Sequence, residues 1–319
     1  MSQPEILMIG PMMQMIEDQL DAAFTVHRHW QVDDFDALVD TVAPVIRGIA
    51  TSHARPVDAA LIDRLPNLEV ISNFGVGYDT VDAAHAGSKG ILVTNTPDVL
   101  TEEVADTAFG LLLMTVRELS AAERHLRAGK WSDGAYPLTR SSLRDRTMGI
   151  LGLGRIGKAI ARRAEASEVG VVYCGRSQQP DVDYRYYADL VDMARDVDIL
   201  MSVIPGGAAT QHIINAEVIE ALGPQGILIN VGRGSAVDEK ALISALQSGA
   251  LFAAGLDVFE HEPSVPDELM ALNNAVLLPH VGSASVHTRD AMGQLVVDNL
   301  TGWFASKSVL TPVAETPVS

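Results

Sequence analysis

The stretch Gly152-Leu-Gly154-Arg-Ile-Gly157 has three glycines in a spacing that suits the binding of a pyrophosphate. An apolar run, Met148–Leu151, precedes it and a helix-period segment, Ile156–Ala166, follows it, which predicts a strand–turn–helix unit. In such a unit the first glycine permits a tight turn, the second lets backbone amides approach the phosphates, and the third allows close helix–strand packing. An ordinary turn with spare glycines is the alternative, but this context favours dinucleotide binding. The expected contacts are Gly152, Gly154, Arg155, Ile156 and Gly157.

The next predicted strand, Gly170–Tyr173, ends in a sequence that bears on the choice of cofactor. Dinucleotide-binding units specific for NAD usually place an acidic residue about 20 residues after the glycines, where it bonds the ribose 2′-hydroxyl. Here that place holds Arg176, followed by Ser177. A guanidinium and a hydroxyl bind a 2′-phosphate by charge-assisted hydrogen bonds, whereas a carboxylate repels it. A surface arginine in a loop is the alternative; we expect NADP(H) rather than NAD(H).

Three further ionisable side chains each follow a predicted strand. They occur in Asn230-Val-Gly-Arg233-Gly234, Asp257-Val-Phe-Glu260-His-Glu262-Pro263 and Leu278-Pro-His280-Val-Gly282-Ser283. Other stretches in the same chain order are Gly75-Val76-Gly77-Tyr78-Asp79, Asn95-Thr96-Pro97, Glu103-Val104-Ala105 and Ile204-Pro205. Together with the glycine motif, this order resembles the D-isomer-specific 2-hydroxyacid dehydrogenase family, and within it the glyoxylate/hydroxypyruvate reductase branch. The resemblance covers nearly the whole chain.

The resemblance implies a catalytic set whose residue types fit the reduction of a 2-keto acid. It makes His280 the acid/base, Glu262 its partner, and Arg233 the residue that binds the substrate carboxylate and carbonyl. A histidine can give and regain a proton near neutral pH, and a carboxylate on its other ring nitrogen fixes the tautomer. A planar guanidinium matches a carboxylate and stays charged when desolvated. Taken singly, each could be structural: a hydrogen-bonded histidine, a solvated glutamate and an ion-paired arginine.

Further contacts follow from the same resemblance. The substrate would be bound by Val76, Gly77, Leu100, Arg233 and His280, with backbone amides at Val76 and Gly77 holding its carboxylate. Additional cofactor contacts would come from Ile204, Pro205, Thr210, Val231, Asp257 and Gly282. Asp257 would accept a hydrogen bond from the nicotinamide carboxamide, although aspartate is also a common turn former. The remaining histidines show no metal-like pairing, so no metal site is expected.

The chain of 319 residues is strongly acidic, with a formal net charge of −18. Such a surface repels nucleic acid and anionic membranes. An acidic protein that uses anionic ligands needs a local cationic site, and Arg155, Lys158, Arg162, Arg163 and Arg176 cluster around the glycine motif. Of these we expect Arg162 and Arg163 to be solvated helix residues.

Several features favour a cytoplasmic protein. The single cysteine, Cys174, cannot form an internal disulfide, and the N-terminus does not read as a signal peptide. The longest apolar run, around Phe109–Val116, is far short of the ~20 residues that span a bilayer.

Short apolar runs alternate with helix-period segments, which predicts an α/β fold with parallel sheets covered on both faces. Expected strands are Ile6–Ile9, Val45–Ile49, Glu69–Asn73, Ile91–Thr94, Met148–Leu151, Gly170–Tyr173, Asp198–Val203, Ile227–Asn230 and Ala275–Leu278. Two segments break this rhythm: Thr101–Leu126 is expected to form one long helix, and a final helix spans roughly Ser285–Ala305.

The resemblance implies two Rossmann-like lobes, with the cofactor lobe inserted into a flavodoxin-like substrate lobe. Residues 1–100 with 285–319 would form the substrate-binding domain, and residues 101–284 the dinucleotide-binding domain. An arm at about 117–147 would make the contact in a homodimer.

We therefore predict NADPH-dependent reduction of small 2-keto acids, glyoxylate to glycolate and hydroxypyruvate to D-glycerate. An aromatic keto-acid reductase of the hydroxyphenylpyruvate type is the alternative, because the same motifs serve both; Phe74, Tyr78 and Leu100 are candidates to line the pocket. A dinucleotide-sensing interaction protein is a further alternative.

Overall fold

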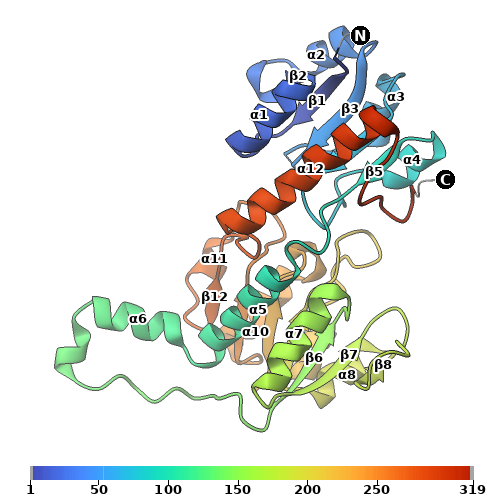
Figure 1. The fold of residues 1–319 in the computed structure, drawn as a ribbon. Helices are drawn as coiled ribbons and strands as arrows, with labels where there is room; N and C mark the ends of the chain where they lie inside the picture. The colour runs from blue at the N-terminus through green and yellow to red at the C-terminus, as the bar shows by residue number, and fades with distance from the viewer. Residues whose placement is uncertain (1–2, 53, 317–319) are drawn as a thin grey trace. The chain divides into compact units, whose positions relative to one another are not determined.

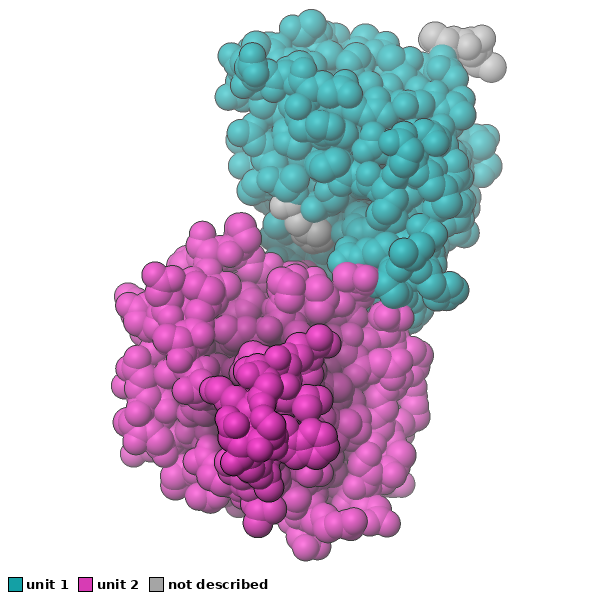
Figure 2. Space-filling model, turned by 90° about the vertical axis from the view of Figure 1, so that its left-hand side faces the viewer, with its two compact units in different colours: residues 1–100, 285–319 teal, residues 101–284 magenta. Residues whose placement is uncertain are grey.

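Two parallel β-sheets flanked by helices make up the protein (Figure 1). The structure is a computed structural model that describes residues 3–52 and 54–316. The chain divides into two compact units, residues 1–100 with 285–319 and residues 101–284, which Figure 2 colours separately. The predicted α/β class with parallel sheets is confirmed.

Residues 101–284 contain the larger, seven-stranded sheet, with the strand order β12-β11-β10-β9-β6-β7-β8 and all neighbours parallel. Its strands are β6 (Thr147–Leu151), β7 (Gly170–Cys174), β8 (Arg185–Tyr187), β9 (Ile199–Ser202), β10 (Ile227–Asn230), β11 (Ala253–Leu256) and β12 (Ala275–Leu277). Leu151 pairs with Cys174 and Ser202, and Asn230 pairs with Ser202 and Leu256. The carboxyl ends of these neighbouring strands therefore lie side by side, and the segments that follow the strands all begin at the same edge of the sheet.

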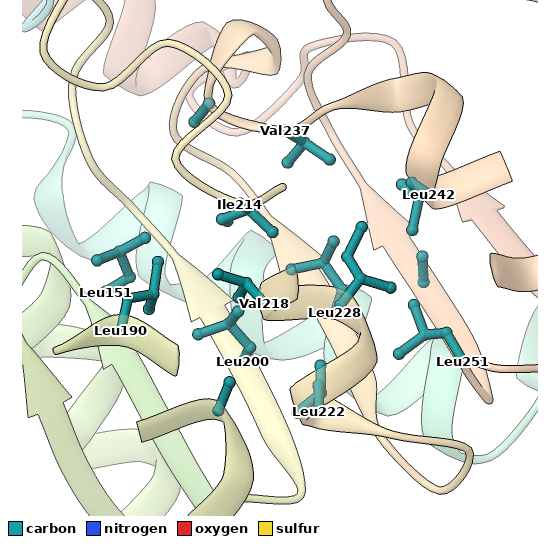
Figure 3. Close-up of a cluster of buried hydrophobic side chains, with 14 of the residues drawn as sticks. Leu151, Leu190, Leu200, Ile214, Val218, Leu222, Leu228, Val237, Leu242 and Leu251 are labelled. Carbon is teal, nitrogen blue, oxygen red and sulfur yellow. The ribbon is translucent and has the colours of Figure 1, made fainter. Parts of the chain in front are cut away.

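The helices of this unit are α5 (Thr101–Val116), α6 (Leu119–Arg127), α7 (Arg155–Ala166), α8 (Leu190–Asp196), α9 (Ala216–Leu222), α10 (Glu239–Ser248) and α11 (Asp267–Met270), with 3₁₀ turns η2 (Lys130–Asp133) and η3 (Gly234–Ala236). Figure 3 shows one buried cluster, in which strand residues Leu200 and Leu228 pack with Val218 and Leu222 of α9. Burying such side chains contributes about 1.5–3 kcal/mol each. This core fixes the strand ends from which the site is built.

Residues 1–100 with 285–319 contain the five-stranded sheet, ordered β2-β1-β3-β4-β5 and again parallel throughout. Its strands are β1 (Glu5–Ile9), β2 (Thr25–Arg28), β3 (Ile46–Thr51), β4 (Val70–Asn73) and β5 (Leu92–Thr94). Its helices are α1 (Gln14–Ala23), α2 (Phe35–Val42), α3 (Ala59–Arg64), α4 (Ala83–Ser88) and α12 (Val286–Ser306), with the 3₁₀ turn η1 (His29–Gln31). The order 2-1-3-4-5 is that of flavodoxin-like sheets.

The expectation of one helix over Thr101–Leu126 is wrong. The helix α5 ends at Val116, and α6 begins at Leu119. Between them Glu118 has a φ of +52°, in the left-handed region that an α-helix cannot continue through. Both helices have helix-forming sequences and no glycine or proline marks the break, so the pattern alone could not reveal it. Along α5 one face is buried, whereas α6 has no buried residue.

Among the described residues, no helix combines the length and the apolar character that crossing a membrane requires.

Candidate active site

The predicted site residues of the larger unit all follow strands at one edge of the seven-stranded sheet. The glycine motif follows β6, Arg176 and Ser177 follow β7, Ile204, Pro205 and Thr210 follow β9, Val231 and Arg233 follow β10, Asp257 and Glu262 follow β11, and His280 and Gly282 follow β12. Ligands of open α/β sheets bind outside the carboxyl ends of the strands, where the strand order reverses. That reversal lies between β6 and β9, which puts the glycine motif at its centre.

The side chains of His280 and Glu262 form a hydrogen-bonded pair. Nδ1 of His280 lies 2.7 Å from Oε2 of Glu262, and Oε1 of Glu262 accepts the N–H of Phe259 at 3.0 Å. Burial alone would raise the pKa of Glu262, but the bonds from His280 and Phe259 and the charge of Arg233 lower it. Glu262 is thus held as an acceptor against one ring nitrogen of His280, which fixes the tautomer. Within the described residues, Nε2 of His280 has no partner, and the side chain is 47% exposed.

Asp257 fixes the turn that carries His280. Its two carboxylate oxygens accept the N–H groups of Val281 and Gly282, each at 2.8 Å, and its carbonyl accepts the N–H of His280. Burial raises the pKa of Asp257, and these N–H groups oppose the rise. His280 has a φ of +52°, an unfavourable conformation that this bonding maintains. The contacts of Asp257 in the described chain are therefore those of a turn former; a nicotinamide contact remains a prediction.

Arg233 follows β10 in a turn that Asn230 orders. The buried Asn230 donates from Nδ2 to the carbonyl of Arg233 at 2.9 Å, and its Oδ1 accepts the N–H of Gly232 at 3.1 Å. Arg233 is half-buried and close enough to Glu262 to lower the pKa of that carboxyl. The structure thus brings Arg233, Glu262 and His280 into one neighbourhood.

The glycine turn has the shape that a bound pyrophosphate requires. Gly152 has a φ of +96°, and a Cβ on Gly157 would lie 2.3 Å from the carbonyl oxygen of Gly152. Both positions therefore need glycine for the turn itself. A Cβ on Gly154 would meet nothing within 4 Å among the described residues, so this glycine borders open space at the N-terminus of α7. Space beside exposed helix N–H groups fits a phosphate group.

The loop after β7 presents Arg176 and Ser177 to solvent. Within the described residues, neither side chain makes a hydrogen bond or an ion pair. The loop itself is anchored: Gln179 donates from Nε2 to the carbonyl of Leu153 at 2.7 Å, and Tyr186 donates to the carbonyl of Gly175 at 3.2 Å. Nothing in the sequence marks Gln179, whose side chain ties the Arg176 loop to the glycine turn.

The loop after β9 is held at both of its ends. Thr210 donates its hydroxyl to the carbonyl of Pro205 at 2.8 Å, and Ile204 is buried. Nε2 of His212 lies 2.6 Å from Oε1 of Glu260, in the segment that leads to Glu262. Thr210 therefore closes its own loop, and a cofactor contact from its side chain stays a prediction.

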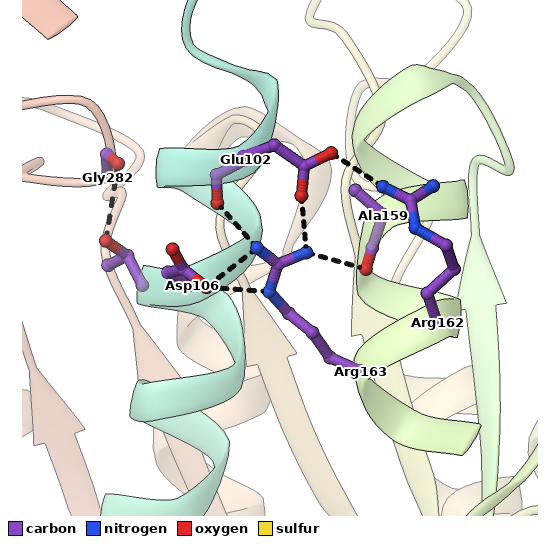
Figure 4. Close-up of polar contacts among 7 residues, drawn as sticks. Glu102, Asp106, Ala159, Arg162, Arg163 and Gly282 are labelled. Carbon is purple, nitrogen blue, oxygen red and sulfur yellow. Dashed lines mark hydrogen bonds and ion pairs between the residues drawn. The ribbon is translucent and has the colours of Figure 1, made fainter. Parts of the chain in front are cut away.

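The expectation of a solvated helix residue holds for Arg162, whose side chain is 58% exposed, and is wrong for Arg163, whose side chain is 21% exposed. Figure 4 shows both side chains bound to α5: Arg162 pairs with Glu102 at 2.6 Å, and Arg163 pairs with Glu102 and Asp106 at 2.8 Å and 2.7 Å. Both acids lie on α5 and both arginines on α7, so these ion pairs clamp the two helices together. Lys158 likewise pairs with Asp181 at 2.7 Å. The basic cluster is mostly neutralised.

The predicted substrate residues of the smaller unit follow β4 and β5. Val76 and Gly77 are half-exposed, and within the described residues their N–H groups have no acceptor. Leu100 is buried, at 5% exposure. Phe74 is also buried, and Tyr78 donates its hydroxyl to Glu315 at 2.9 Å.

Known proteins resemble this chain over nearly its full length. The family model described as "D-isomer specific 2-hydroxyacid dehydrogenase, NAD binding domain" matches residues 109–282. Glyoxylate/hydroxypyruvate reductase A of Arabidopsis thaliana is 49% identical, over 97% of this chain and 98% of its own. Hydroxyphenylpyruvate reductase of Plectranthus scutellarioides is 47% identical over the same shares.

Among solved structures, the NADPH-dependent glyoxylate/hydroxypyruvate reductase of Sinorhizobium meliloti, in complex with NADP and malonate, is 52% identical. Its TM-score is 0.94, over 99% of this chain and 98% of that one. The fold, the order of the motifs and these matches confirm the resemblance: the chain belongs to the D-isomer-specific 2-hydroxyacid dehydrogenase family.

Proposed function

We propose that this protein reduces small 2-keto acids with NADPH, converting glyoxylate to glycolate and hydroxypyruvate to D-glycerate. The observation that carries the proposal is the His280–Glu262 pair, 2.7 Å apart, at the same sheet edge as Arg233 and the glycine turn. The relative of Arabidopsis thaliana is named a glyoxylate/hydroxypyruvate reductase, and that of Sinorhizobium meliloti an NADPH-dependent glyoxylate/hydroxypyruvate reductase.

Each residue of the pair and its neighbour has a defined task in this proposal. His280 donates a proton from Nε2 to the carbonyl oxygen of the keto acid as the alcohol forms. Glu262 orients the ring and stabilises its protonated form. Arg233 binds the substrate carboxylate through its guanidinium, which stays charged when water is excluded.

The dinucleotide would be held by residues 101–284. The N-terminus of α7 and the open space at Gly154 receive the pyrophosphate, and Arg176 with Ser177 bind the 2′-phosphate. The proposed contacts are Gly152, Gly154, Arg155, Ile156, Gly157, Arg176, Ser177, Ile204, Pro205, Thr210, Val231, Asp257 and Gly282. NADPH supplies the hydride when bound.

Residues 1–100 with 285–319 would form the substrate-binding domain. In this proposal Val76 and Gly77 give their N–H groups to the substrate carboxylate, and Leu100 lines the substrate site. Two open N–H groups in a glycine-rich turn suit an anion.

Steady-state assays with NADPH and NADH against glyoxylate, hydroxypyruvate and hydroxyphenylpyruvate test the function. We expect turnover with the two small acids and a preference for NADPH. Absence of turnover with every keto acid would refute the proposed enzymatic function, and a dinucleotide-sensing interaction protein would then be the remaining hypothesis.

An aromatic keto-acid reductase is the second candidate, supported by the 47% identity to hydroxyphenylpyruvate reductase. A kcat/KM higher for hydroxyphenylpyruvate than for glyoxylate or hydroxypyruvate would favour it.

We also propose a cytoplasmic homodimer joined by the arm at about 117–147. Figure 1 shows α6 standing away from the sheet of its own unit, and Leu126, Trp131 and Leu138 are exposed. Exposed apolar side chains on a projecting segment suit a protein contact. Light scattering after gel filtration tests this: a monomer would refute it.

A further inference from the structure

In the turn after β4, the carbonyl groups of Gly75, Val76 and Gly77 are each held by a side-chain or backbone donor. Nδ2 of Asn73 donates to the carbonyls of Gly75 and Gly77, at 3.1 Å and 3.0 Å. Nδ2 of Asn95 donates to the carbonyl of Val76 at 2.8 Å. The N–H of Thr96 adds a second bond to Gly75, at 3.0 Å.

These bonds also determine where the neighbouring N–H groups point. In a planar trans peptide, the C=O of one residue and the N–H of the next are directed oppositely. The carbonyl of Gly75 therefore orients the N–H of Val76, and the carbonyl of Val76 orients the N–H of Gly77. Both N–H groups are turned away from the two asparagines and lack an acceptor in the described part of the chain.

The two asparagines are themselves firmly placed. Asn73 is the last residue of β4 and is fully buried. Asn95 donates its N–H to the carbonyl of Thr311 at 3.2 Å and accepts the Thr311 hydroxyl at 2.6 Å. That hydroxyl accepts a bond from Asn299 of α12 at 2.9 Å. Burial and these hydrogen bonds therefore hold both asparagine residues in place beside the turn.

We propose that Asn73 and Asn95 are positioning residues that hold the N–H groups of Val76 and Gly77 in place for the substrate carboxylate. The inference rests on the proposed function and assigns to that site two side chains that need not touch the substrate. Asn230 orders the Arg233 turn of the other unit in the same way, by donating to a carbonyl of the turn that follows its strand.

The orientation that lets Nδ2 of Asn73 donate two hydrogen bonds leaves the other end of the amide without a partner in the described part of the chain. Its Oδ1 is buried and has no partner among the described residues. An unsatisfied buried acceptor destabilises the folded state. Only the NH₂ group bonds the turn, so Asn73→Asp, which keeps the shape and replaces the donors by an acceptor, removes both hydrogen bonds to the turn and also buries a carboxyl.

The test compares Asn95→Ala and Asn73→Asp with the unchanged protein, using glyoxylate as substrate and oxamate as a competitive inhibitor. Because a lost hydrogen bond is worth about 1 kcal/mol, we expect KM for glyoxylate and the inhibition constant of oxamate to rise together by roughly 5- to 20-fold. The value of kcat should change less than about threefold, and NADPH affinity, measured by fluorescence, should not change.

Asn67→Ala is the matched control. Asn67 lies before β4, at its opposite end, and donates from Nδ2 to the carbonyl of Pro44 at 2.7 Å. It loses the same kind of bond in the same unit, and KM should stay unchanged. A second readout is the pH dependence of Asn73→Asp, whose KM defect should shrink in acid because a protonated carboxyl regains a donor.

Two kinetic outcomes overturn the proposal. The first is that KM for glyoxylate and the inhibition constant of oxamate are unchanged in both folded variants. The second is that kcat and NADPH affinity fall as much as KM rises, which marks a merely structural role. If Asn73→Asp does not fold, Asn95→Ala decides alone.

Calorimetry of oxamate binding to the NADPH-loaded protein needs no turnover, so it tests this inference separately from the proposed function. Oxamate binding that the variants do not weaken is the third outcome that overturns the proposal.

Discussion

His280 and Glu262 are joined by a 2.7 Å contact between Nδ1 and Oε2, and the second oxygen of Glu262 is occupied by the N–H of Phe259. Both carboxylate oxygens therefore act as acceptors at the same time. A carboxamide could keep both contacts only by donating its NH₂ group to Nδ1 of His280, which would reverse the donor and acceptor roles in that bond. A carboxylate in particular is therefore needed to accept a proton-bearing Nδ1 and to stabilise the doubly protonated ring.

His280→Ala removes the proposed proton donor. Since general acid–base catalysis contributes typically 10²–10⁴-fold, we expect kcat for glyoxylate to fall by about that factor. Glu262→Gln keeps the shape but has one acceptor oxygen, so a smaller fall, on the order of 10- to 1,000-fold, should follow. NADPH binding, measured by fluorescence, should survive in both variants. A loss of NADPH affinity equal to the loss of turnover would make His280 structural.

The lowered pKa of Glu262 predicts a particular acid response. A carboxyl whose folded pKa lies below its unfolded value contributes stability above the unfolded value, and this is lost as pH falls through the folded value. The stability difference between the unchanged protein and Glu262→Gln should therefore be constant at neutral pH. It should shrink only below about pH 4.3, the usual glutamate value. Urea unfolding at several pH values measures this; a difference that already fades between pH 7 and 6 would contradict the assignment.

Arg176→Asp combined with Ser177→Ala tests the choice of cofactor. Hydrogen bonds to charged groups are worth about 1.5–3 kcal/mol, so KM for NADPH should rise by roughly 10- to 100-fold while KM for NADH changes little. Arg185→Asp is the matched control, because Arg185 lies on the adjacent β8 and is engaged with Asp196 and Tyr187. Arg185→Asp makes the same change of charge and should leave the preference for NADPH over NADH unaltered. Unchanged selectivity in the double variant would exclude a 2′-phosphate contact from this loop.

Two glycines of the same turn should respond differently to alanine. A Cβ on Gly157 would collide with the Gly152 carbonyl, so Gly157→Ala should lose about 1–3 kcal/mol of stability and several degrees in Tm. Gly154 has a φ of −80° and open space, so Gly154→Ala should keep its Tm. Its NADPH affinity should nevertheless fall, by about tenfold or more, because the phosphates need close backbone approach. Normal NADPH affinity in Gly154→Ala would place the pyrophosphate elsewhere.

The strand ends and the residues that follow them could be predicted from the sequence. Apolar runs such as Ile227–Asn230 are short and buried on both faces, and therefore stand out between helix-period segments. No range was predicted for β11 (Ala253–Leu256), because Ala-Ala-Gly-Leu contains no β-branched or aromatic residue. The edge strands β2 and β8 were not predicted either, because Thr25–Arg28 and Arg185–Tyr187 contain no apolar run. An edge strand is stabilised by one neighbour and by its surroundings, which a local pattern does not report.

The supporting contacts of the site could not be predicted. Asn73 bonds residues two and four positions away, yet nothing in its type says that its amide faces the turn rather than solvent. Gln179 reaches Leu153, 26 residues earlier, through a contact that exists only after β6 and β7 have paired. Residue types at strand ends show which chemistry is possible, whereas the bonds that orient them depend on the finished fold.

Arg163 provides the last test, since its guanidinium bonds Glu102 and Asp106 of α5 and the carbonyl of Ala159. Arg163→Gln should lower Tm by roughly 2–5 °C, because it removes several bonds of a half-buried cation between two packed helices. Arg162→Gln is the control: Arg162 is 58% exposed and, in the described part of the chain, its side chain pairs only with Glu102, and an exposed pair contributes little. The gap between Arg163→Gln and the unchanged protein should narrow in 1 M NaCl, because salt screens exposed acids such as Glu102. Equal Tm values for both variants would show that α5 and α7 are held by apolar packing and that the ion pairs are incidental.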